Sequence, residues 1–356
     1  METTIHLEDI WQDYGLDKLE GSLKTLFPEY SFSFNELLEQ ILTGDVLGAL
    51  TNLLQSVIKG LGAEAAGLKN ILVWLLVLGF VSAIMSYFVA IFDKHQIADL
   101  SFYVMYLLLT TVLLKCFEQA AQIAVQAVES IVLFIKLLVP TYLLAVGVAT
   151  GTTTVSAYYQ LLLLLIYGVE NILVAGVIPL VYSYCMLAVV NGIWIEEKLT
   201  LLMDLLMKGI QAVLKAAVGV VTGVSVFQAV ITPVLDSVKS SALQKAISAI
   251  PGIGNAADGV VELVTGSAVV IKNCLGIVFL LLLLALCAAP LLRIFLIACI
   301  LKGAAAVMGI VSDKRITSCT DKVGEGGMLL FRTAGTAMLL FLITISMITT
   351  ATNRGF

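Results

Sequence analysis

Among the ionisable residues inside the long apolar stretches of this 356-residue chain or at their edges, six are the first candidates for chemistry. They are Glu129, Lys136, Glu170, Lys272, Arg293 and Lys302. A charge at membrane depth is costly, so such a group either lines a path for ions or water, pairs with a group on another helix, or extends its charge to the membrane surface. We name four of the six as candidate pathway residues and leave all three readings open: Glu129, Lys136, Glu170 and Lys272.

The distance between two of these candidates along a helix limits what they do together. Glu129 and Lys136 are seven residues apart, which is two helical turns or about 10 Å of rise. They therefore share a helix face without touching, and each requires a partner on another helix. Three prolines inside apolar stretches are candidate kinks or hinges, because proline removes one helical hydrogen bond: Pro140, Pro179 and Pro290.

Sequence motifs for enzymatic chemistry are absent from the chain. It contains no Walker sequence, no GxSxG elbow and no HExxH. The six cysteines form no CxxC pair, and His6 and His95 stand beside no cluster of metal-ligand residues. The sequence therefore predicts a protein that is not an enzyme and that has no cofactor and no metal site.

The composition identifies the elements that must position these residues. The chain is 60% hydrophobic and 13% charged, whereas a soluble domain has roughly 45 to 50% apolar and about 25% charged residues. The apolar stretches have the length of membrane-crossing helices. They run over residues 71–92, 100–117, 123–148, 161–190, 271–289, 291–310 and 328–350, whereas residues 199–214 are amphipathic and residues 216–230 are apolar but of marginal length. We predict an all-α, polytopic transmembrane helical bundle with six to eight spans and additional amphipathic helices.

The irregular stretches carry more specific expectations. Residues 161–190 are too long for one straight crossing and are expected to form a kinked helix or a re-entrant pair. The blocks 271–289 and 291–310 meet at Pro290, which predicts a helical hairpin. Residues 312–327 are expected to be a polar connector, and its lysines and arginine place it on the cytoplasmic side.

The first 70 residues differ from the remainder of the chain. They hold eleven acidic residues against four lysines, so nucleic acid is not an expected partner. From Phe34 to Leu61 the apolar residues follow helical spacing, with Gly44 and Gly48 as candidate breaks. We predict an acidic, amphipathic-helical extramembrane segment over residues 1–70 and a multispanning membrane domain over residues 71–356.

Several short motifs, in a fixed order, resemble one protein family. The run begins with Gly151-Thr152-Thr153-Thr154-Val155-Ser156-Ala157 and Ile178-Pro179-Leu180, and continues with Ala249-Ile250-Pro251-Gly252-Ile253-Gly254, Ile271-Lys272-Asn273, Ala289-Pro290-Leu291 and Ser312-Asp313-Lys314-Arg315-Ile316. In this order the motifs resemble the stage III sporulation protein AE family over roughly residues 130 to 350.

The resemblance implies a function that the spacing of residues does not. It implies a multispanning component of a sporulation channel or secretion-like complex, located in the mother-cell membrane around the forespore and needed for late forespore gene expression. The implied partners are membrane proteins of the same sporulation operon, namely ring-forming proteins and an ATPase, together with a forespore-side partner. Membrane lipid is a further expected contact, and a homo-oligomer is left open.

A second function class remains as an alternative. Segments around residues 149–180 echo segments around residues 264–291, as in the internal repeats of transporters. Together with Glu129, Lys136 and Glu170, this echo favours an autonomous secondary transporter of a small solute.

Overall fold

The computed structural model describes Gly21 and residues 34–91, 95–150, 164–194, 198–247 and 254–351, and nearly all of them are helical. A further helical stretch covers residues 164–170 and leads into a π-helical segment. The elements are α3 (Phe34–Leu42), α4 (Val46–Ile91), α5 (His95–Thr150), η1 (Asn171–Val177), α7 (Ile178–Asn191), α8 (Thr200–Ile247), α9 (Gly254–Met308) and α10 (Lys314–Ala351).

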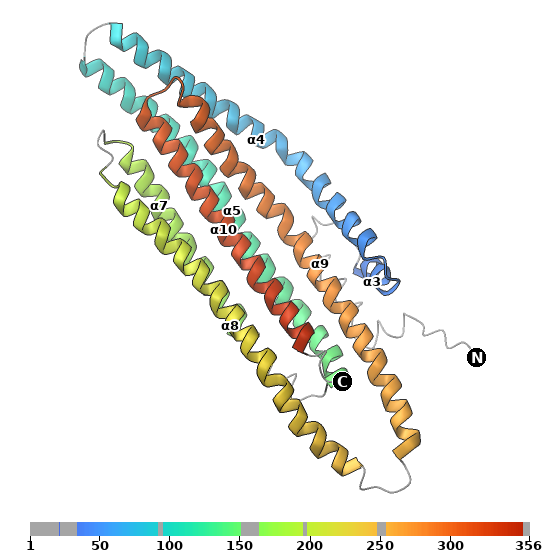
Figure 1. Cartoon of the computed structure of the whole chain (residues 1–356). Coiled ribbons are helices and arrows are strands. Elements are labelled where there is room, and N and C mark those ends of the chain that lie inside the picture. Colours follow the sequence, from blue (N-terminus) through green and yellow to red (C-terminus); the bar gives the residue numbers. More distant parts are fainter. Residues whose placement is uncertain are drawn as a thin grey trace.

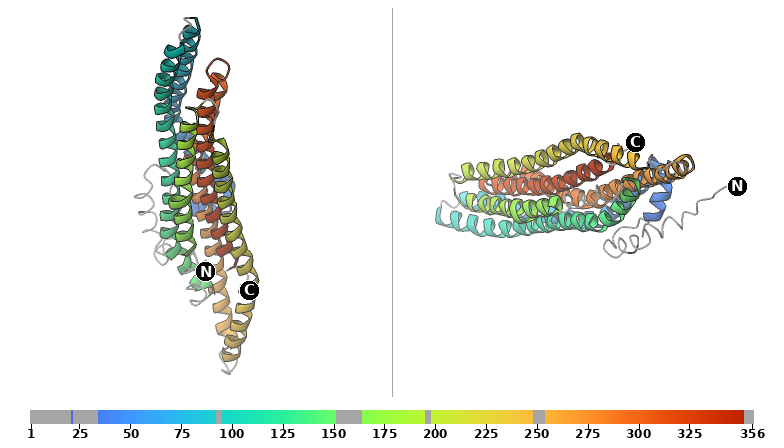
Figure 2. Two further views of the ribbon diagram at one scale, coloured as in Figure 1. Left: turned by 90° about the vertical axis from the view of Figure 1, so that its left-hand side faces the viewer. Right: turned by 90° about the horizontal axis from the view of Figure 1, so that it is seen from below.

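The long helices run up and down side by side and form an elongated bundle (Figures 1 and 2). The ends of α4, α7 and α9 lie at one end of the bundle, drawn at the top of Figure 1 and here called the upper end. Helix α10 is central, because it packs against α9, α5, α8 and α7. The core is therefore a continuous apolar interior that surrounds α10.

Five helices of the described residues are long and apolar enough to cross a membrane. They cover Phe102–Leu138, Leu164–Asn191, Thr200–Val224, Asn273–Met308 and Lys314–Ser346. A shorter apolar helix, Leu72–Ile84, lies where the sequence predicts the first span. The all-α membrane bundle predicted from composition is confirmed.

The amphipathic segment that begins at Phe34 breaks at one of its two candidate glycines. Gly44 has φ +85°, a conformation that side chains disfavour, and it separates α3 from α4. Gly48 instead lies inside α4, where its N–H donates to Asp45 Oδ1 at 2.9 Å. Asp45 therefore caps the new helix, and α3 folds back so that Leu37, Leu38 and Ile41 are buried.

Two predicted spans are one helix. The stretches 100–117 and 123–148 both belong to α5, which is 56 residues long and continuous. Residues 118–122 lie between them, and their glutamate, glutamines and alanines all have good helix propensity. Ala120 and Ala121 are also fully buried against the bundle. We predicted a helix end where the sequence becomes more polar, but the helix continues there and only the surroundings of its side chains change.

The predicted hairpin at Pro290 is wrong. Helix α9 runs through Pro290 without interruption for 55 residues. A proline inside a membrane helix is tolerated when neighbouring structure compensates for the lost hydrogen bond. Here the helix continues because residues on both sides of Pro290, including Leu286, Ala289 and Ile294, are buried in the core.

The predicted polar connector over residues 312–327 is also wrong, because α10 begins at Lys314. Asp313 starts this helix: its carboxylate accepts a hydrogen bond from the Arg315 N–H at 2.8 Å, as N-cap residues do. The charged residues that follow are therefore helical and packed, and the turn between α9 and α10 is short.

The stretch 161–190 is resolved, in its described part, as a continuous helical run with a π-helical insert. The insert η1 ends directly before α7, in which Pro179 is the second residue. A proline ring clashes with the carbonyl four residues earlier in an α-helix, and a π turn is a known way to accommodate such a defect. The π-helical segment therefore lies directly before Pro179, and the role of Pro179 as a kink or hinge stays a prediction.

The division of the chain at residue 70 stays a prediction. A single helix, α4, spans residues 46–91 and crosses that position. Residues 1–33, apart from Gly21, lie outside the described residues, as do most of the residues that open the family-like run, 151–163.

Candidate functional site

Two of the sequence-predicted residues come together across helices. Lys136 of α5 donates to Glu170 Oε2 at 3.5 Å. Their side chains are 48% and 38% exposed, so the pair lies on the outer surface of the bundle rather than in its interior. Each charge at this position is matched by the other, which favours the pairing reading over a lined path.

The other predicted residues are not drawn into this pair. Glu129 lies on α5 with its side chain exposed, two turns from Lys136 as the spacing requires. Lys272 belongs to α9 and Pro140 to α5, but their side chains lie outside the described ones. Their roles as pathway and hinge residues stay predictions.

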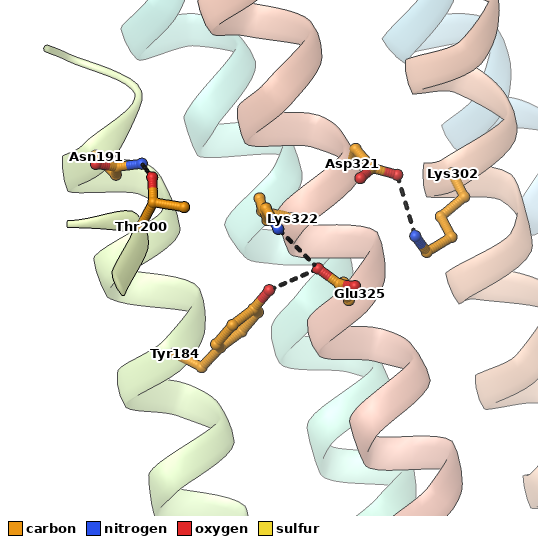
Figure 3. A network of polar contacts seen from close by, with 7 residues as sticks. All are labelled: Tyr184, Asn191, Thr200, Lys302, Asp321, Lys322 and Glu325. Carbon is orange, nitrogen blue, oxygen red and sulfur yellow. Dashed lines mark hydrogen bonds and ion pairs between the residues drawn. The ribbon is translucent and has the colours of Figure 1, made fainter. Parts of the chain in front are cut away.

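A second polar cluster, which the sequence did not identify as a site, lies between α7, α9 and α10 (Figure 3). The hydroxyl of Tyr184 on α7 donates to Glu325 Oε2 on α10 at 2.8 Å. Lys322, one turn earlier on α10, donates to the same oxygen at 3.2 Å. Tyr184 is fully buried, so this carboxylate oxygen receives a donor from its own helix and a donor from the core.

The same turn of α10 faces α9 with a second ion pair. Lys302 of α9 donates to Asp321 Oδ1 at 3.1 Å, and Figure 3 shows this pair on the side of α10 opposite Tyr184. The cluster thus contains two lysines and two carboxylates and is electrically neutral. Charge-assisted hydrogen bonds are stronger than neutral ones, so these contacts fix α10 relative to α7 and α9.

Glycines allow the helices of the cluster to approach each other. A Cβ atom at Gly326 would collide with Cys185 Sγ, and one at Gly324 would collide with the Lys302 side chain. At Gly327 a Cβ would lie 3.1 Å from the Cβ of Ala298. Small residues drive close helix packing in membranes, and here they flank Glu325 on both sides.

Polar contacts continue toward the upper end of the bundle. Asn191, the last residue of α7, accepts a hydrogen bond from the Leu199 N–H at 2.8 Å and donates to Thr200 Oγ1 at 3.4 Å. The buried Tyr106 of α5 donates to the Val189 carbonyl at 2.5 Å. At this end of the bundle, these contacts join the end of α7 to the start of α8 and to α5.

Arg315 completes this end. Its guanidinium lies 3.4 Å from the Phe102 ring centroid and donates to both carboxylate oxygens of Asp313, each at 3.2 Å. An arginine stacked on an aromatic ring and held by a bidentate pair has little remaining freedom. The first turn of α10 is therefore anchored to α5.

The arrangement orders helices and holds polar groups in fixed positions within an apolar bundle. Each charged member of the cluster is bonded to a group of opposite charge or to a tyrosine hydroxyl. No group of three or more potential metal ligands occurs among the described residues. The geometry is suited to holding neighbouring helices in fixed positions through polar contacts.

Sequence reasoning missed Glu325 and Asp321 because it assigned residues 312–327 to a polar connector between helices. One signal was present: Gly324, Gly326 and Gly327 surround Glu325, and a carboxylate among small residues marks close helix packing better than a loop. The sequence could not identify Tyr184, because nothing in an apolar stretch shows which tyrosine hydroxyl will contact a charged group on another helix.

Comparisons with known proteins agree on one family. The family model described as stage III sporulation protein AE matches residues 32–352. The stage III sporulation protein AE of Bacillus subtilis (strain 168) is 23% identical over 265 residues, which are 74% of this chain and 66% of that relative. No solved structure matches. Because the family model covers most of its length, the chain belongs to the stage III sporulation protein AE family.

Proposed function

We propose that this protein is a non-enzymatic membrane component of a sporulation channel or secretion-like complex that links mother cell and forespore. The observation that carries the proposal is the family match over residues 32–352. The five helices able to cross a membrane support the membrane part of this proposal.

The polar cluster supports a structural rather than a catalytic role. A catalytic group is held where a substrate can reach it, whereas Glu325 Oε2 accepts hydrogen bonds from both Tyr184 and Lys322. The Tyr184 bond joins α7 to α10, and the Lys322 bond holds the carboxylate in place within α10. A rigid bundle of this kind is suited to support partner proteins in the membrane.

The proposal extends to location and partners. The protein would reside in the mother-cell membrane around the forespore, next to ring-forming proteins and an ATPase of the same operon and opposite a forespore-side partner. The absence of a Walker sequence in this chain leaves energy supply to another protein. Late forespore gene expression would depend on the assembled complex.

Deletion of the gene in its host tests the proposal. We expect forespores to form but to lose expression of a late forespore reporter, and we expect the wild-type gene supplied in the mother cell to restore it. Supplying the gene in the forespore alone should not restore it. Normal late expression in the deletion strain would contradict the proposal.

A secondary transporter of a small solute is the second candidate, motivated by the sequence echo between residues 149–180 and 264–291. The exposed Lys136–Glu170 pair does not line an interior path, so its role in transport is tested directly. Gradient-driven uptake by the purified protein in liposomes, lost in Glu170→Gln, would support this candidate. Uptake that is absent, or that is unchanged by Glu170→Gln, would exclude a transport role for this pair.

A further inference from the structure

The outer face of α8 is the least covered surface among the candidate spans. Within its apolar part only 17% of residues are buried, against 39 to 61% in the other four. It attaches to α10 and α7 through a narrow line of buried residues: Met203, Ile210, Leu214 and Val221. Most of the circumference of α8 therefore faces lipid or another protein.

Two lysines on this exposed face of α8 would be costly if only lipid covered it. Lys208 and Lys215 are exposed, and neither forms an ion pair with a described residue. Lys208 lies eight residues and Lys215 fifteen residues after Thr200, where α8 begins, which is about 12 and 22 Å along the helix. A lysine side chain extends roughly 6 Å, so both charges favour an anionic partner at membrane depth.

Small residues form a stripe beside the two lysines. At about 100° per residue they lie opposite the buried line of α8. They are Gly209, Ala212, Ala216, Gly219 and Gly223. A Cβ atom at any of these three glycines would meet nothing within 4 Å. A second helix can thus approach closely on this side of α8.

Acidic groups of the required kind lie on the outer face of α5. Glu118 and Glu129 share one side of this helix, are exposed, and form no ion pair with a described residue. Lys115 and Lys136 are the other charges on this side, and Lys136 is already paired with Glu170. Helices α5 and α8 lie on opposite sides of the bundle (Figure 2, right).

The charges on the two faces lie at similar depths, the first pair level and the second offset by about 6 Å. The Phe117 and Tyr182 rings are in contact at 5.1 Å, and Asn191 bonds to Thr200 across the α7–α8 turn. Tyr182 lies nine residues below Asn191 on α7. Because α8 descends from Thr200, the α8 residue at the same height is nine residues after Thr200, which is Gly209. Lys208 and Glu118 are therefore level, and Lys215 and Glu129 follow about 10 and 16 Å further down.

We propose that copies of this chain associate side by side in the membrane, with the α8 outer face of one copy against the α5 outer face of the next. Lys208 and Lys215 then lie beside Glu118 and Glu129 of the neighbour. Rotation about the membrane normal keeps depth unchanged, so level charges meet when copies are related in this way. A contact between two different faces repeats into a ring or an open row. The proposal is independent of the proposed function.

Charge reversal in the full-length chain tests this contact. Four forms are reconstituted in lipid nanodiscs or detergent and sized by mass photometry: the wild type, K208E/K215E, E118K/E129K and all four changes together. We expect the wild type to be oligomeric, each double variant to self-associate at least tenfold more weakly, and the fourfold variant to recover. The matched control is Lys314→Glu, an exposed charge outside both faces, which should leave the size unchanged.

Mixing the two double variants gives the sharpest outcome. Neither self-associates if the proposal holds, yet an equimolar mixture should form oligomers, because each copy now meets opposite charge on both sides. Thermal unfolding of each variant shows that it is folded. A monomeric wild type, double variants of unchanged size, or a mixture that stays monomeric would each overturn the proposal; a monomeric wild type would assign the α8 face to another protein.

Discussion

The Tyr184 hydroxyl is the contact that joins α7 to the charged turn of α10. Tyr184→Phe removes one donor from Glu325 and leaves Lys322 in place. Hydrogen bonds to charged groups contribute about 1.5 to 3 kcal/mol in soluble proteins, but side-chain hydrogen bonds in membranes average only about 0.6 kcal/mol. We therefore expect a loss of about 1 to 2 kcal/mol in unfolding free energy, measured by denaturation in detergent.

Tyr182→Phe is the matched control for this substitution. Tyr182 lies on the same helix, packs edge-on against Phe117 and makes no hydrogen bond within the described structure through its hydroxyl. Its change should alter stability by less than about 0.5 kcal/mol. Equal effects of the two substitutions would remove the special role of the Tyr184–Glu325 bond.

Gly326 offers a second prediction at the scale of single residues. Gly326→Ala places a methyl group against Cys185 Sγ, and overpacking of a core typically costs about 1 to 3 kcal/mol. Cys185→Ala removes the sulfur, so the double variant should recover most of the stability lost in Gly326→Ala. The coupling is read from a double-mutant cycle; strict additivity would show that the two residues do not meet.

Residue-scale reasoning from sequence reached part of the site. Lys136 and Glu170 were both identified as costly charges, but their pairing depends on a contact between segments 34 residues apart, which spacing cannot supply. Glu325 was lost because its helix was not recognised, although its glycine neighbours carried the relevant signal.

Among the elements, the turn at Gly44 has the clearest local cause. With φ at +85°, an alanine there is strained by roughly 1 to 2 kcal/mol. We expect Gly44→Ala to loosen the docking of α3, seen as faster hydrogen exchange in the peptide that contains Leu37, Leu38 and Ile41. Gly168→Ala is the control, since it is helical and open; its substitution should be neutral or stabilising. Unchanged exchange in Gly44→Ala would contradict this view of the turn.

The errors at the scale of elements share one physical origin. Pro290, the polar run after Phe117 and the charged run after Ser312 were all expected to interrupt helices. Helices α9 and α5 instead continue through the first two, and α10 begins within the third. In each case tertiary packing compensates for a local disadvantage, which sequence propensity does not report. Gly44 was predicted correctly because its cause is the backbone conformation itself.

At the scale of the whole molecule, composition alone predicted an all-helical membrane protein, and the motif order predicted its family. What composition could not give is the length of the helices. Helix α9 has 55 residues, or about 80 Å, against roughly 30 Å of hydrocarbon. The bundle therefore extends beyond the bilayer, with α8 and α9 reaching furthest at the lower end of Figure 1.

Topology mapping tests the central claim, a bundle of continuous helices that cross the membrane in alternation. A reporter of membrane side is placed in the α8–α9 connector and another at Ser312 in the α9–α10 turn. If α9 is one crossing helix, the two reporters lie on opposite sides of the membrane, and a third in the α7–α8 turn agrees with Ser312. Reporters on the same side in the α8–α9 connector and at Ser312, as a hairpin at Pro290 would give, would contradict the account.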